Sequence, residues 1–146
     1  MTEVLIKRLS KNIELPKYET NGSSGMDLSA NIEMQIKIEP GKTSIIPTGI
    51  SVSIPKNFEI QIRSRSGLAA KSQISILNSP GTIDADYRGE LKVILINLSN
   101  KTFVVERGTR IAEMVLCPIV KAKFKEVDNL DDTIRGDGGF GSTGLK

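Results

Sequence analysis

Apolar and polar residues alternate along much of this 146-residue chain, and this two-residue period constrains its fold more than any other feature. Successive side chains of a β-strand point to opposite faces, so such alternation predicts strands with one buried face. Residues 91–96 and 111–120 are more continuously apolar, which predicts strands buried on both faces. The alternation is clearest in four segments: 4–9, 34–38, 50–54 and 58–62.

Glycine and proline mark turns between these segments. No twelve-residue segment keeps the apolar stripe of an amphipathic helix, and residues 67–71 allow one short helical turn. Many short strands between turns predict an all-β antiparallel fold, as a sandwich, jelly roll or small barrel. The pattern ends near residue 128, so we expect a β domain over residues 1–127 and a flexible arm over residues 128–146.

The chain contains no histidine and a single cysteine, Cys117. The missing histidine excludes Ser-His-Asp and Cys-His nucleophile systems and histidine-ligated zinc. A catalytic proton acceptor is therefore expected to be a carboxylate, and any metal a hard, oxygen-ligated ion such as Mg²⁺. Cys117 lies in an apolar run, which predicts a buried structural thiol, and its being alone fits a reducing compartment.

The net charge of +3 is modest, and the basic residues are scattered. Lys121, Lys123 and Lys125 alternate, a pattern that favours the solvated face of a strand over a nucleic-acid patch. Without tryptophan the chain has few platforms for stacking single-stranded bases, so we expect a small anionic ligand and no nucleic acid. It has no leading apolar segment and no apolar run of about 18 residues. We therefore expect a cytoplasmic protein that makes no membrane contact.

The last twelve residues contain five glycines, whose backbone N–H groups are able to curl around an anion. Arg135 offers a bidentate fork for phosphate oxygens, and Ser142 and Thr143 add hydroxyl donors. Phe140 offers an apolar plate for a planar ring. This composition predicts an arm that closes over a phosphorylated, ring-bearing ligand; an ordinary glycine-rich disordered tail is the alternative.

Two further motifs lie in the β domain. Arg65, Ser66 and Gly67 follow a predicted strand and suit phosphate binding, although taken alone they favour an ordinary turn with a solvated arginine. In residues 78–89, a buried amide at Asn78 would read a donor and an acceptor on a base. A carboxylate in the same segment, at Asp84 or Asp86, would orient and deprotonate water, and the other would be a turn former.

Two more acids stand in notable places. Asp27 follows a glycine turn at the start of a strand, where it would hold a metal-bound water or fix the turn. Glu113 interrupts an otherwise apolar strand, so we expect it either to be paired with an arginine or to lie on the exposed face.

Together, in this order and on an all-β chain, these five motifs resemble those of the homotrimeric dUTP pyrophosphatases (dUTPases), over residues 22–144. The resemblance implies a jelly-roll β-barrel that assembles as a homotrimer with three shared sites, each capped by a neighbour's C-terminal arm. It also implies hydrolysis of dUTP to dUMP and pyrophosphate, which limits uracil in DNA and supplies dUMP for dTMP synthesis.

By this resemblance, one group of residues would hold the nucleoside and attack the substrate. Asp84 would orient the water that attacks the α-phosphorus. Tyr87 would pack under the deoxyribose and leave no room for a 2′-hydroxyl. Uracil would be read by Asn78 and by the backbone near Thr82, Ile83 and Lys92.

A second group would hold the triphosphate. The resemblance implies that Arg65, Ser66 and Gly67 hold the phosphate chain and that Phe140 stacks on the uracil. Mg²⁺ would be held mainly by the triphosphate and by water, with Asp27 in its outer shell. Around the β- and γ-phosphates the arm would place Arg135, Gly141, Ser142 and Thr143.

Two positions depart from the family pattern. Ser64 stands where the family usually has proline, and we expect it to loosen the turn. Glu113 stands where the family usually has glutamine, and we expect it to pair with Arg110, Arg65 or Arg135. The alternatives to a dUTPase are a dCTP deaminase of the same superfamily and a catalytically silent nucleotide-sensing module.

Overall fold

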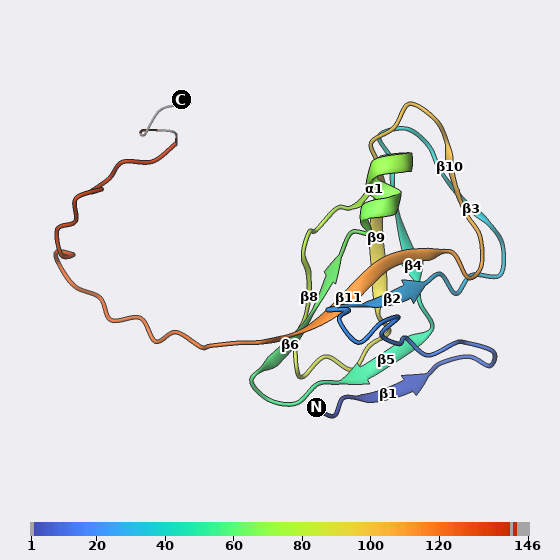
Figure 1. The fold of residues 1–146 in the computed structure, drawn as a ribbon, viewed down its shortest axis with the longest axis horizontal. Helices are drawn as coiled ribbons and strands as arrows, with labels where there is room; N and C mark the ends of the chain where they lie inside the picture. The colour runs from blue at the N-terminus through green and yellow to red at the C-terminus, as the bar shows by residue number, and fades with distance from the viewer. Residues whose placement is uncertain (1, 141, 143–146) are drawn as a thin grey trace.

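The structure is a computed structural model that describes residues 2–140 and 142. Short strands dominate this part of the chain, and its one helix is only seven residues long (Figure 1). The elements are, in order, β1 (Leu5–Arg8), β2 (Met26–Ser29), β3 (Ile36–Ile38), β4 (Thr43–Pro47), β5 (Ile50–Ser53), β6 (Phe58–Arg63), α1 (Ser66–Ser72), β7 (Ile74–Ile76), β8 (Gly81–Ile83), β9 (Lys92–Asn97), β10 (Phe103–Val105) and β11 (Arg110–Pro118).

All strand pairs of the described chain are antiparallel, as expected for an all-β fold. The largest sheet has the order β2-β11-β6-β8, and a second has the order β4-β9-β7. Two smaller ladders join β1 to β5 and β10 to β3. The prediction of an all-β antiparallel fold is therefore confirmed, although the ladders in the described residues do not join into one closed ring.

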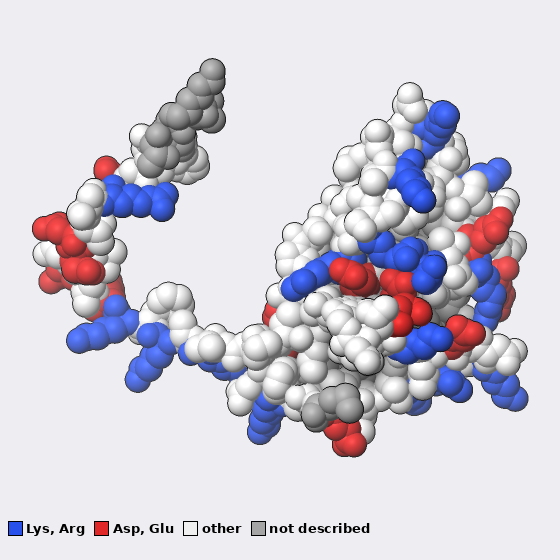
Figure 2. Space-filling view, viewed as in Figure 1, with Lys and Arg blue, Asp and Glu red and all other residues white. Residues whose placement is uncertain are grey.

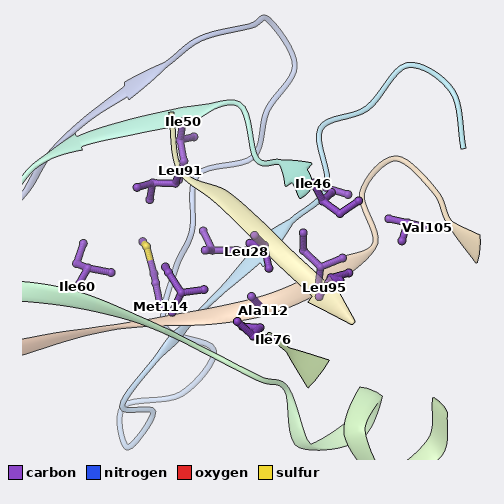
Figure 3. Packing of buried hydrophobic residues seen from close by; sticks show 14 of the residues in the cluster. Leu28, Ile46, Ile50, Ile60, Ile76, Leu91, Leu95, Val105, Ala112 and Met114 are labelled. Atoms are coloured by element: carbon purple, nitrogen blue, oxygen red, sulfur yellow. The ribbon is translucent and has the colours of Figure 1, made fainter. Parts of the chain in front are cut away.

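The hydrophobic core lies between the sheets and is built from the inward-facing member of each alternating pair (Figure 3). Leu28 from the larger sheet and Ile46 and Leu95 from the smaller one are at most 1% exposed. Each such side chain contributes about 1.5–3 kcal/mol of burial free energy. The two-residue period of the sequence thus becomes the two faces of each sheet.

The six segments expected to be strands all contain one, in β1, β3, β5, β6, β9 and β11. The other strands are three to five residues long and lie outside these six segments. Cys117 was expected to be buried, and this expectation is wrong. Its side chain is half-buried on the outer face of β11, with its Sγ 3.7 Å from Nη2 of Arg63.

Strand β6 lies between β11 and β8 and sets the positions of two chemically important segments. Ile60 pairs with Ile83, so the loop after β8 begins beside the first residues of β6. Helix α1 begins three residues after the other end of β6, after Ser64 and Arg65. The two segments therefore lie at opposite ends of one strand.

Beyond β11 the chain leaves the domain. Ile119 N–H still donates to the Asn57 carbonyl at 2.9 Å, and the residues after it run away from the sheets (Figure 1). The side chains of Val120, Phe124 and Ile134 are at least 95% exposed. Along this extended segment Figure 2 shows basic side chains nearest the domain, followed by acidic ones. No helix in residues 2–140 is long and apolar enough to cross a membrane.

Candidate active site

A cavity of about 170 Å³ lies beside the loop after β8. It brings together five of the residues singled out from the sequence, and it also includes Glu90, which sequence reasoning missed. The lining residues are Thr82, Ile83, Asp84, Tyr87, Glu90 and Lys92. The edge of β8, two carboxylates, an aromatic ring and a cation thus share one small space.

The loop that carries Asp84 is held by its own backbone. The Tyr87 N–H donates to the Asp84 carbonyl at 3.1 Å, which closes a turn over residues 84–87. The Arg88 guanidinium donates to the carbonyls of Ala85 at 2.7 Å and Tyr87 at 2.9 Å, and so covers this turn from outside. Asp86 is exposed and is absent from the cavity lining, whereas Asp84 lines it. The geometry thus places Asp84, and not Asp86, in the cavity lining.

Glu90 ties this loop to the rest of the domain. Its Oε1 accepts the backbone N–H of Gly49 at 2.9 Å, and its Oε2 lies 3.9 Å from Nζ of Lys92. Gly49 is buried and has a φ of 73°, a conformation that favours glycine. The contact joins positions 41 residues apart, so no local pattern in the sequence predicts it.

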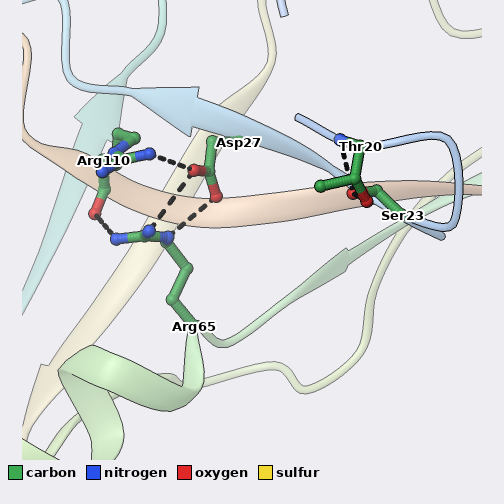
Figure 4. A network of polar contacts seen from close by, with 5 residues as sticks. All are labelled: Thr20, Ser23, Asp27, Arg65 and Arg110. Carbon is green, nitrogen blue, oxygen red and sulfur yellow. Dashed lines mark hydrogen bonds and ion pairs between the residues drawn. The ribbon is translucent and has the colours of Figure 1, made fainter. Parts of the chain in front are cut away.

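A second group of charges surrounds Asp27 on β2 (Figure 4). Arg65 Nε donates to Asp27 Oδ1 at 2.8 Å, and Arg65 Nη2 donates to Oδ2 at 3.3 Å. Arg110 Nη1 reaches the same Oδ2 at 3.0 Å, and Arg65 Nη1 donates to the Arg110 carbonyl at 3.2 Å. Asp27 therefore fixes two arginines beside the first turn of α1, where Ser66 and Gly67 lie.

Glu113 does not make the ion pair expected from the sequence. It lies opposite Asp27 on β2 and opposite Arg63 on β6, yet within the described residues no cation comes within 4.0 Å of its carboxylate. The physical reason is competition, because Asp27 already engages both Arg65 and Arg110. Glu113 instead leans toward Gly25, where an added Cβ would lie 3.1 Å from its Oε2.

Ser64 also differs from expectation. Its hydroxyl accepts the Ile76 N–H at 2.9 Å and bonds the Ser75 hydroxyl at 3.0 Å. It therefore ties the end of β6 to β7 and does not loosen the turn before Arg65.

Asn78 is exposed in this chain, contrary to the expectation of a buried amide. Its Nδ2 lies close to Gly81, at 3.2 Å from where a Cβ on that glycine would stand. The absence of a side chain at Gly81, the first residue of β8, therefore leaves room for the Asn78 amide.

The two groups are far apart within one chain. Asp84 follows β8 next to the start of β6, and Arg65 follows the end of β6. Six residues of extended chain separate the two positions, which corresponds to about 20 Å. The cavity and the phosphate-binding candidates of one chain therefore lie at opposite ends of β6.

The C-terminal arm reaches neither group in this chain (Figure 1). Arg135 Nε donates to the Gly138 carbonyl at 2.8 Å, and the side chain of Phe140 is fully exposed. Ser142 donates its backbone N–H to the Gly139 carbonyl at 3.0 Å. Gly141 and Thr143, also predicted to contact phosphate, lie outside the described residues.

In residues 2–140 and 142, no three acidic or cysteine side chains gather closely enough to hold a metal ion directly. Asp27 accepts three hydrogen bonds from the two arginines. A carboxylate has roughly four acceptor positions, so one remains for a metal-bound water. The donor set fits an ion held through water and ligand oxygens, and it does not fit a protein cage.

The family model for dUTPase matches residues 11–144, almost the entire chain. The chain belongs to the dUTPase family. A deoxyuridine 5′-triphosphate nucleotidohydrolase from Rickettsia bellii (strain OSU 85-389) is 54% identical over 146 residues, covering 99% of this chain and 97% of the relative. One from Ehrlichia canis (strain Jake) is 52% identical over 149 residues, covering 99% and 97%.

Solved dUTPase structures share the fold. A mutant dUTPase of Staphylococcus bacteriophage 80alpha with dUpNHpp superposes with a TM-score of 0.89 at 26% identity, covering 99% of this chain and all of that one. With the family established, the jelly-roll-like class predicted from the sequence is confirmed.

Proposed function

We propose that this chain is a dUTP diphosphatase, which hydrolyses dUTP to dUMP and pyrophosphate. The observation that carries this proposal is the cavity beside Asp84, where five sequence-predicted residues meet in a chain of the dUTPase family. The named activity of the Rickettsia relative and the nucleotide analogue bound to the phage enzyme support it.

In the proposed mechanism, Asp84 orients a water molecule and accepts its proton as the water oxygen bonds the α-phosphorus. The bond from the α-phosphorus to the bridging oxygen breaks, and pyrophosphate leaves with that oxygen. The turn over residues 84–87 fixes the backbone from which this carboxylate projects. Hydrolysis of a phosphoanhydride depends mainly on such positioning and on charge neutralisation.

The nucleoside would occupy the cavity. The backbone of Thr82 and Ile83, with the amide of Asn78, would hydrogen-bond the edge of uracil, and Lys92 lies at the same opening. A cytosine would leave these groups wrongly paired, which is the more discriminating form of recognition. Tyr87 would pack under the deoxyribose and reject a ribose.

The triphosphate would lie against Arg65 and the N-terminal residues of α1, Ser66 and Gly67. The first N–H groups of a helix have no partner within it and point toward an approaching anion. Asp27 holds the Arg65 guanidinium through two contacts, so the cation is oriented before the ligand arrives. Arg135, Phe140, Gly141, Ser142 and Thr143 of the arm would close over the nucleotide.

Mg²⁺ is the proposed cofactor. Asp27 would hold it through a water molecule at its remaining acceptor position, and the triphosphate would supply the direct ligands. When bound, such an ion neutralises phosphate charge and favours departure of pyrophosphate.

We further propose a homotrimer with shared sites. The separation of about 20 Å between the Asp84 and Arg65 positions supports a site in which the nucleoside cavity and the phosphate contacts come from different subunits. The extended arm, over residues 128–146, would then cap a neighbour's site beyond the β domain of residues 1–127. A cytoplasmic location and the absence of a nucleic-acid partner remain predictions.

Incubation of the purified chain with dUTP and, separately, with dCTP tests the activity. We expect dUMP and pyrophosphate from dUTP and no ammonia from dCTP. Ammonia from dCTP with dUTP left intact would identify a dCTP deaminase, and binding of dUTP without turnover would identify a sensing module.

Subunit mixing tests the shared site. Asp84→Asn and Arg65→Ala are each expected to be inactive alone. If the two residues act across an interface, random mixed trimers regain activity at about a quarter of their sites. If both residues served a site within one chain, refolding the two variants together would restore nothing.

A further inference from the structure

Tyr87 is packed against the backbone of Gly89, and the contact is too close to allow any side chain there. A Cβ added at Gly89 would overlap the hydroxyl oxygen and Cζ of Tyr87 and would lie 2.9 Å from its Cε2. Real Cβ atoms essentially never come closer than 3.0 Å to a neighbouring heavy atom. Any residue larger than glycine would therefore move the ring.

The backbone at Gly89 does not itself demand glycine. Its φ lies outside the left-handed region, whereas Gly41, Gly49 and Gly108 all have φ above 70°. At Gly22, by contrast, an added Cβ would have no neighbour within 4 Å, so a side chain would fit there. Outside the adjoining residues, the three atoms nearest to a side chain at position 89 all belong to Tyr87.

The same end of the ring is also held by a hydrogen bond. The Tyr87 hydroxyl donates to the Glu90 carbonyl at 3.0 Å, and Glu90 is anchored to Gly49 through its side chain. The Gly89 backbone and the Glu90 carbonyl therefore together fix the hydroxyl end of the ring in the cavity. Because 44% of Tyr87 is exposed, a displaced ring has open solvent to move into.

We propose that Gly89 is a positioning residue for sugar selectivity, acting through the Tyr87 ring. The proposal rests on the proposed function, in which this ring packs under deoxyribose and excludes ribose. A steric wall discriminates only while it stays in place, and a displacement of about 1 Å is enough to cost up to 100-fold in rate. Gly89 would hold that wall while touching no part of the nucleotide itself.

The test compares Gly89→Ala with wild type and with Gly22→Ala, a matched exposed glycine. Turnover of dUTP by the wild-type chain comes first, because its absence would overturn the proposed function and not this inference. We then expect the ratio of kcat/KM for dUTP to that for UTP to fall at least tenfold in Gly89→Ala. The ratio should be unchanged in Gly22→Ala.

A ratio within twofold of wild type in Gly89→Ala would overturn the proposal, whether activity is retained or falls equally for both nucleotides. If Gly89→Ala does not fold, the selectivity of Tyr87→Phe for dUTP over UTP tests the proposal instead. It removes the hydroxyl that bonds the Glu90 carbonyl, and we expect its selectivity to fall several-fold. Unchanged selectivity in that folded variant would likewise overturn the proposal.

A spectroscopic measurement reports on the ring directly. The chain has two tyrosines and no tryptophan, so Tyr87 is the only tyrosine left in a Tyr18→Phe background. We expect its near-ultraviolet circular dichroism to weaken when Gly89→Ala is added. An unchanged spectrum would mean that the ring has not moved and would contradict the inference.

Discussion

The loop after β8 and the C-terminal arm are both rich in polar residues, yet one is held by the domain and the other is not. The loop is closed by backbone hydrogen bonds, covered by Arg88 and anchored through Glu90 to Gly49. The described part of the arm hydrogen-bonds only within itself beyond Ile119, and its large side chains are exposed. The difference fits the proposed mechanism, in which the loop is the preformed half of the site and the arm takes shape only over bound nucleotide.

The largest expected effect lies in the preformed half. Asp84→Asn should lower kcat by about 10²–10⁴-fold, because the amide cannot accept the proton of the attacking water. Steady-state turnover of dUTP measures this loss. Asp86→Asn is the control in the same loop and should turn over normally; equal losses in both variants would mean that the acid is misassigned.

Removal of the arm should give the next largest effect. A chain truncated after Ile134 should lose about 100-fold in kcat through poorer closure over the phosphates. Its melting temperature should stay within about 2 °C of the full chain, since residues beyond 134 make no described bond to the β domain. Full activity in the truncated chain would remove the arm from the mechanism.

A single arm side chain should matter less than the whole segment. Phe140→Ala should raise KM for dUTP about tenfold, because base stacking contributes about 1–3 kcal/mol. Leu130→Ala, also exposed in the arm, is the control. Equal KM values for the two variants would argue against stacking on the base.

The smallest effect is expected at the hydrogen bond between Glu90 and Gly49 that anchors the loop, and it concerns stability. Glu90→Ala leaves the buried Gly49 N–H without its acceptor, which should lower the free energy of unfolding by about 1–3 kcal/mol. Urea unfolding measures this change, with exposed Glu33→Ala as the control. Equal stability of Glu90→Ala and wild type would show that the loop holds its place without this anchor.

Sequence reasoning succeeded where the signal is local. Alternation located β1, β5 and β6 because burial of one sheet face imposes a period of two. It did not locate β7 and β8, which are three residues long. It predicted the burial of Cys117 wrongly, because an apolar run does not reveal that one face of β11 points outward.

The candidate site divides in the same way. The residue types around Asp84 and Arg65 could be chosen from their motifs, since their chemistry is carried by neighbours in the sequence. The pairing of Glu113 could not be predicted in this way. Whether Asp27 or Glu113 engages Arg65 and Arg110 depends on which strands lie side by side. Glu90 was missed for the same reason, as its partner lies 41 residues away.

By itself, the sequence determined an all-β chain, an acid-based chemistry without histidine, and the five motifs of a dUTPase. Only the tertiary structure decided that Asp84 and not Asp86 faces the cavity, that Asp27 holds both arginines, and that Gly89 supports the Tyr87 ring. The physical reason is that periodicity and residue type are local properties of a chain. Contacts between strands depend on register, and register is fixed only when the sheets pack around one core.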